Sequence, residues 1–184
     1  MKKLYGLLLI LLFIMPLIFQ PTFYQVLKLR TFDRFVVTPE ESGYFAVLSI
    51  TEEDIDQEGG YPLPRDRLAE IHDNLLSRGA TGVGWVIGFP HADRLGGDEK
   101  FAAALSHSSS VLALFENNNN EYPPTVGTVT LGEEVGGFKA QGTIQNIDIL
   151  KDSDWTDQGI ASAPVEVDSL VRRIPLLYST PQGW

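Results

Sequence analysis

The N-terminal apolar run constrains this chain more than any other feature. Residues Leu4–Phe19 carry no charge and follow two lysines. Sixteen helical residues extend only roughly 24 Å, whereas a bilayer core needs about 30 Å. We therefore expect one transmembrane helix over residues 4–27 that continues through Gln20 and Pro21. Proline is tolerated in such a helix when the freed carbonyl finds another partner.

A cleaved signal peptide is the alternative interpretation of the same run. Such peptides end in small residues, but residues 18–23 read IFQPTF. The chain has no cysteine, which excludes a lipoprotein anchor. Basic residues flank both ends of the run, so charge alone leaves its orientation open. Because a three-residue tail cannot be the functional side, we expect residues 1–3 in the cytoplasm and residues 28–184 outside, at the cell (inner) membrane.

Composition limits the kinds of partner. The net charge is −10, which argues against nucleic acid and against docking on anionic lipid. The absence of cysteine excludes thiol catalysis, disulfide bonds and Cys-ligated zinc. About 155 residues follow the predicted anchor, which is enough for one domain with its own core.

The hydrophobic pattern predicts an α/β fold: a mainly parallel sheet with covering helices and an additional β-rich insertion. Short apolar runs alternate with amphipathic stretches, as in strand–helix–strand units. A juxtamembrane helix over residues 23–37 precedes them. The predicted strands are residues 45–50, 83–89 and 111–115, and the predicted helices begin at Pro64 and at Asp98, the latter as N-cap.

The remaining segments are expected to be loops and late strands. Residues 52–58 read as an acidic loop. Residues 116–142 contain four consecutive asparagines, a proline pair and several glycines, which predicts an exposed insertion. Further strands are expected at residues 143–149, 165–167 and 174–178, the last two antiparallel.

Several motifs occur in a characteristic order. They are an aspartate after the anchor in Leu29–Arg34, the sequence Tyr61-Pro-Leu-Pro-Arg65, Arg78-Gly-Ala80, a glycine-rich strand ending at Phe89, Gly96-Gly-Asp98, and the late Asp168–Leu176. Together they resemble the CHASE2 domain, an extracytoplasmic sensory module of bacterial receptors. The resemblance spans essentially the whole chain. Where the family usually carries aspartates, this chain has Thr51 and Val86, so a ligand site formed there in relatives is altered here.

The resemblance implies a non-catalytic sensor in a homodimeric, membrane-embedded receptor. Such receptors bind an unknown small ligand or protein signal and relay its state through membrane helices. Their output is an adenylate or guanylate cyclase or a histidine kinase, expected here beyond residue 184.

Six polar residues are candidate ligand contacts. His91 and Asp93 follow a predicted parallel strand, and ligands of open α/β sheets bind at such ends. Three of the others have structural alternatives: a capped turn for Asp98 and structural ion pairs for Arg65 and Arg172. The six candidates are Asp54, Arg65, His91, Asp93, Asp98 and Arg172.

Catalytic and metal motifs are missing from the sequence. It has no G-x-S-x-G, H-E-x-x-H or P-loop pattern. An EF-hand starting at Asp152 would have Asp157 at position six and Ala163 at position twelve, where glycine and glutamate are required. We therefore expect no catalytic residue, cofactor or metal; a calcium site of another kind, in residues 148–157 or in the acidic loop over residues 52–58, is the alternative. Two alternatives to a sensor remain: a membrane-tethered hydrolase that uses loop carboxylates, and an assembly module that binds a partner through residues 116–142.

Overall fold

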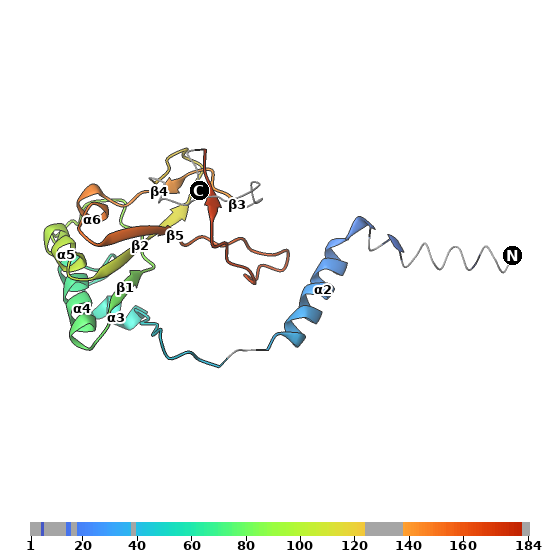
Figure 1. The fold of residues 1–184 in the computed structure, drawn as a ribbon, viewed down its shortest axis with the longest axis horizontal. Helices are drawn as coiled ribbons and strands as arrows, with labels where there is room; N and C mark the ends of the chain where they lie inside the picture. The colour runs from blue at the N-terminus through green and yellow to red at the C-terminus, as the bar shows by residue number, and fades with distance from the viewer. Residues whose placement is uncertain (1–4, 6–13, 16–17, 38–39, 124–137, 182–184) are drawn as a thin grey trace, which may run out of the picture. The chain divides into compact units, whose positions relative to one another are not determined.

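The computed structural model describes residues 5, 14–15, 18–37, 40–123 and 138–181. The chain forms two compact units. The smaller contains Met1–Val47 and Pro164–Arg173, and the larger contains Leu48–Ala163 and Ile174–Trp184. Figure 1 shows the order of elements along the chain.

The larger unit is built on a mainly parallel sheet, as the sequence predicts. Its central strand is β2 (Ser109–Glu116). β2 pairs in parallel with β1 (Gly82–Trp85) and with β5 (Thr156–Ile160), and antiparallel with β4 (Thr143–Ile144). A second, two-stranded sheet joins β3 (Phe138–Lys139) in parallel to β6 (Tyr178–Ser179).

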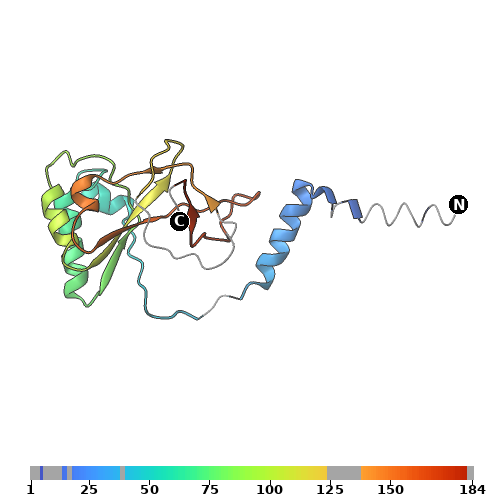
Figure 2. The same ribbon diagram turned by 45° about the horizontal axis from the view of Figure 1, so that its top comes forward.

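Three helices supply side chains to the core beside this sheet. They are α4 (Arg65–Ser77), α5 (Asp98–Leu105) and α6 (Asp148–Lys151). Both ribbon views place α4 and α5 side by side (Figure 2). The two predicted helices are thus confirmed, but the N-cap of α5 is Gly97 and not Asp98. A Cβ atom at Gly97 would lie 2.5 Å from the backbone nitrogen of Asp66, so only glycine lets the start of α5 approach α4 this closely.

An aromatic cluster fills the centre of the core. The ring of Phe101 is fully buried and meets Trp85 and Phe89 edge to face, with centroids 5.3 and 5.4 Å away. Leu112 of β2 and Leu150 of α6 are also fully buried in this cluster. Burial of these large side chains is the main favourable contribution to folding of the unit.

A buried histidine lies beside the aromatic cluster. His72 of α4 is fully buried, and its Nδ1 accepts from Trp85 Nε1 at 3.4 Å. The indole N–H can only donate, so Nδ1 carries no proton, and Nε2 is left to face Ser108 Oγ at 3.4 Å. Burial lowers the pKa of His72, while Asp73 opposes and His107 reinforces the shift.

We expect acid to destabilise the larger unit through His72. The unfolded chain binds a proton near pH 6.5, whereas folded His72 resists protonation. Stability therefore falls as pH drops below about 6.5, by at most about 1.4 kcal/mol per pH unit. Urea unfolding of wild type and His72→Gln between pH 7.5 and 5.5 measures this slope. Stability should depend less steeply on pH in His72→Gln than in wild type. His107→Gln changes an exposed histidine and should keep most of the wild-type pH dependence. Equal slopes for wild type and His72→Gln would contradict the assignment.

The predicted strand over residues 45–50 is wrong. This segment pairs with no strand in the described chain, and Phe45 and Val47 are 90% and 92% exposed. Only Ile50 packs against the core. An apolar run indicates that a segment favours burial. Whether that segment becomes a strand depends on a free edge of a neighbouring strand, which the run itself does not reveal.

Other boundaries also differ from the prediction. The acidic segment forms the helix α3 (Glu52–Gln57), and the strand predicted from residue 83 ends at Trp85 instead of continuing to Phe89. Residues 165–167 form no strand, and β6 pairs in parallel where the sequence predicts an antiparallel strand. Of residues 143–149 only the first two are in a strand, while β5 has no counterpart among the predicted strands. Residues 124–137 of the predicted insertion lie outside the described residues.

The smaller unit contains α2 (Thr22–Phe35), which confirms the juxtamembrane helix. The predicted continuous helix through Gln20 and Pro21 is wrong, because Gln20 has φ +40° and α2 begins after Pro21. Proline disfavours the helical conformation of the residue before it. Much of the predicted anchor lies outside the described residues. Among the residues that are described, every helix is too short or too polar to span a bilayer.

Candidate functional site

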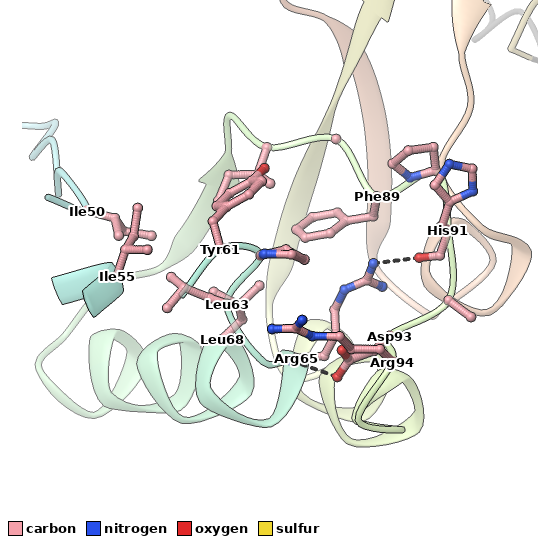
Figure 3. Close-up of a pocket in the computed structure, with 15 residues that line it drawn as sticks. Ile50, Ile55, Tyr61, Leu63, Arg65, Leu68, Phe89, His91, Asp93 and Arg94 are labelled. Atoms are coloured by element: carbon pink, nitrogen blue, oxygen red, sulfur yellow. Dashed lines mark hydrogen bonds between the residues drawn. The ribbon is translucent and has the colours of Figure 1, made fainter. Parts of the chain in front are cut away.

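A pocket opens in the larger unit at the carboxyl end of β1 (Figure 3). Its volume is about 510 Å³, within the range of small-molecule sites. The loop after β1, residues 87–94, forms one wall, and α3 and the approach to α4 form the others. Figure 3 shows Ile55 and Leu63 toward one side and Arg65, Asp93 and Arg94 toward the other. The pocket therefore has an apolar part and a charged part.

Arg65 joins the start of α4 to the loop after β1. Its side chain is only 9% exposed, and Nη1 donates to Asp98 Oδ1 at 2.5 Å. Its Nη2 donates to the carbonyl of His91 at 2.7 Å, and the guanidinium lies 4.6 Å from the centroid of the Phe89 ring. A cation over an aromatic face is itself favourable. Arg65 thus has ion-pair, hydrogen-bond and cation–π partners within the protein.

Asp93 organises the same loop. Its Oδ2 accepts the backbone N–H groups of Arg65 and Gly97, both at 3.1 Å, and its Oδ1 accepts that of Leu95 at 3.3 Å. Its own N–H donates to Asp98 Oδ2 at 2.8 Å. Burial favours a higher pKa for Asp93, but these backbone bonds outweigh it and the pKa is lowered. Asp93 is therefore an anion whose oxygens are already occupied by backbone donors.

The six sequence candidates separate into three places. Arg65, His91 and Asp93 line the pocket, and Asp98 supports them through Arg65. Asp54 lies on α3, where its carboxylate accepts from Thr51 N and Oγ1 in a capping box. The Thr51 backbone bond is the largest cause of the lowered pKa of Asp54. The sixth candidate, Arg172, belongs to the smaller unit.

Arg94 also lines the pocket, although it is not among the six sequence candidates. Within the part of the chain that the structure describes, its guanidinium makes no hydrogen bond and no ion pair. Its only sequence signal is its place one residue after Asp93, in the loop that follows a parallel strand. Arg94 is therefore a cation available at the pocket wall.

A second cluster, which we call the arginine clasp, consists of Asp33, Asp168 and Arg172 in the smaller unit. Arg172 is 8% exposed and binds Asp33 of α2 through Nε and Nη2, both at 2.7 Å. Its Nη1 and Nη2 donate to Asp168 at 2.8 and 2.6 Å. Paired N–H···O bonds of this kind are strong and directional. The clasp joins two segments that lie 139 positions apart in the chain.

The pKa shifts of the three clasp residues agree with these hydrogen bonds. Hydrogen bonds from Arg172 are the main reason that the pKa of Asp168 falls to about 2. They are also the main reason that the pKa of Asp33 is lowered. The two carboxylates in turn raise the pKa of Arg172. All three groups are therefore charged at neutral pH.

The described residues contain no group of three or more side chains that could hold a metal ion. The acidic residues on α3 and near Asp152 do not converge on one point.

Comparison with known families identifies the chain. The family model for the CHASE2 domain matches residues 7–184. The chain belongs to the CHASE2 family. CHASE2 is a family of extracytoplasmic sensory domains of signalling receptors. No curated protein and no solved structure matches this CHASE2 chain.

Thr51 and Val86, where the sequence resemblance leads us to expect aspartates, do not line the pocket. Thr51 is the N-cap of α3, and Val86 is 75% exposed. Arg65, in the Tyr61–Arg65 motif, holds the loop that forms one wall of the pocket. Arg172, in the Asp168–Leu176 motif, forms the arginine clasp.

Proposed function

We propose that this CHASE2 domain senses a signal outside the cytoplasm and relays it through its N-terminal helix to a cyclase or histidine kinase output. The observation that carries the proposal is the arginine clasp. It ties Asp33, near the end of α2, to Arg172 near the end of the described chain. A relay needs two states that bind the signal with different affinity, and a polar clasp of this kind can be made in one state and broken in the other.

Membrane anchoring through residues 4–27 is part of the proposal, with the domain on the periplasmic or extracellular side. An extracytoplasmic family and an uncharged N-terminal run support this placement. In a homodimeric receptor, α2 would transmit the signal beside its copy. α2 buries none of its residues and exposes Phe23 and Phe35 at 78% and 77%, and apolar side chains so exposed favour a lipid or protein contact.

The clasp predicts different outcomes for two adjacent arginines. Arg172→Gln removes a buried cation that holds two carboxylates, whereas Arg173 is 76% exposed and pairs only with Glu166 among the described residues. We expect Arg172→Gln to shift the output of the receptor that carries this domain. Amide exchange in the last turns of α2 should also rise about tenfold, because local opening becomes easier.

Cyclic-nucleotide production or phosphorylation measures the output, and hydrogen exchange followed by mass spectrometry measures α2. Arg173→Gln is the matched control and should leave both readouts near wild type. If both variants behave alike, the clasp has no part in the relay. A normal output after deletion of residues 39–183 would overturn the sensor proposal itself.

A further inference from the structure

The pocket beside β1 combines an apolar body with an available cation. The apolar part includes Ile50, Ile55, Leu63 and Ile87, which come from the residues before α3, α3 itself, the approach to α4 and the loop after β1. These side chains approach from segments that are separate in sequence, so the cavity depends on the folded unit. A volume of about 510 Å³ accommodates a small organic molecule.

The charged groups around the pocket differ in whether the protein already supplies their partners. Arg65 is neutralised by Asp98 at 2.5 Å, and the oxygens of Asp93 accept three backbone N–H groups. Arg94 lines the same wall, and among the described residues no partner takes up its charge. Figure 3 shows Arg94 beside Arg65 and Asp93 at the charged part of the pocket. An anionic ligand would supply the ion-pair partner that the Arg94 guanidinium lacks among the described residues.

We propose that the pocket binds a small organic monoanion, with an apolar body against the isoleucine and leucine side chains and a carboxylate against Arg94. The proposal rests on the sensing function above and names the chemical class of its ligand. A cationic ligand would meet Arg94 as a like charge. A multiply charged ligand would lose hydration against the apolar walls without enough donors to replace it. An arginine fork matches the geometry of a carboxylate.

Three probes with the same phenylbutyl skeleton test the class: 4-phenylbutanoate, 4-phenylbutan-1-ol and 4-phenylbutylamine. The full chain is placed in lipid nanodiscs with ¹³C-labelled isoleucine methyl groups, and empty nanodiscs correct for partition into lipid. We expect the methyl signals of Ile50, Ile55 and Ile87 to shift with the carboxylate, while Ile149 on α6 stays unchanged. The dissociation constant should be about 0.1–1 mM, as is usual for a fragment of this size.

The charge of the probe decides the outcome. We expect the carboxylate to bind about tenfold more tightly than the alcohol, from one charge-assisted contact, and the amine to bind most weakly. Arg94→Gln should reduce carboxylate binding to the level of the alcohol. Arg78→Gln, which changes an exposed arginine outside the pocket, should leave it unchanged. Equal affinity for acid and alcohol, or no effect of Arg94→Gln, overturns the proposal.

Two further variants test the location. Ile55→Asp places a charge in the apolar wall and should abolish binding of all three probes. Val86→Asp adds the same charge at an exposed position outside the pocket and should not. Should the carboxylate fail to shift the pocket methyl groups while Arg172→Gln still alters output, the ligand class is wrong and the sensor proposal stands. Binding of the carboxylate together with an unchanged output after deletion of residues 39–183 would mean the reverse: the ligand class is right and the sensor proposal is wrong.

Discussion

We expect Phe101→Ala to be the most destabilising single substitution considered for the larger unit, with a loss of about 3–5 kcal/mol in the free energy of unfolding. The ring of Phe101 is fully buried between Trp85 and Phe89. Its removal loses the burial of the ring and leaves a cavity between two large aromatic groups that cannot close together. Edge-to-face contacts with both neighbours are lost as well, each worth about 0.5–1.5 kcal/mol within that total.

Equilibrium urea unfolding of the full chain in mild detergent, followed by tryptophan fluorescence, measures this loss. The control is Val86→Ala, which truncates a side chain that is 75% exposed, and which should change stability by less than about 0.5 kcal/mol. A loss below about 1 kcal/mol for Phe101→Ala would show that the core does not pack around this ring.

The second large effect is expected for Arg65→Met, at about 2–4 kcal/mol. Removing one partner of a buried ion pair typically costs about 3–5 kcal/mol, and the partial exposure of Asp98, at 15%, reduces that figure. Methionine retains an apolar stem against Phe89, but Asp98 Oδ1 and the His91 carbonyl lose their Arg65 donors. The loop after β1 should therefore loosen, and binding in the pocket should weaken with it.

A double-mutant cycle separates the ion pair from simple loss of packing. Arg65→Met combined with Asp98→Leu removes both charges, so the double variant should be less destabilised than the sum of the single variants. Arg67→Met is the matched control in the same helix, because the Arg67 side chain is 45% exposed. Arg67 pairs with Glu58 and Glu70 near the surface, so the control should lose less than about 1 kcal/mol. Additive effects in the cycle would contradict a coupled Arg65–Asp98 pair.

Local patterns predict those elements whose determinants lie within a few residues. The helix α4 follows from apolar residues at helical spacing and from Gly79, which follows the C-cap residue with a φ of +99°. β2 is predictable because a short, strongly apolar run bounded by polar residues favours a buried strand. His91 and Asp93 also lie, as the sequence indicates, in the loop beyond the end of a parallel strand.

The errors arise where a segment's state depends on a partner distant in sequence. Residues 45–50 are as apolar as β2, yet no strand edge receives them in the described structure. β5 reads as polar, with Asp157 and Gln158, but becomes a strand because β2 offers a full register of partners. The helix α3 is hard to predict because its acidic composition masks the Thr51–Asp54 capping box.

The sequence by itself determined the family, the α/β class, the acidic surface and the residues that carry the motifs. These features depend on composition, periodicity and the order of short motifs, all of which are local in the chain. Only the tertiary structure decided what the motif residues do. Arg65 is neutralised by Asp98, Arg94 is left available at the pocket wall, and Arg172 reaches Asp33. Those assignments depend on which charges meet in space, and residues 139 positions apart meet only after the chain has folded.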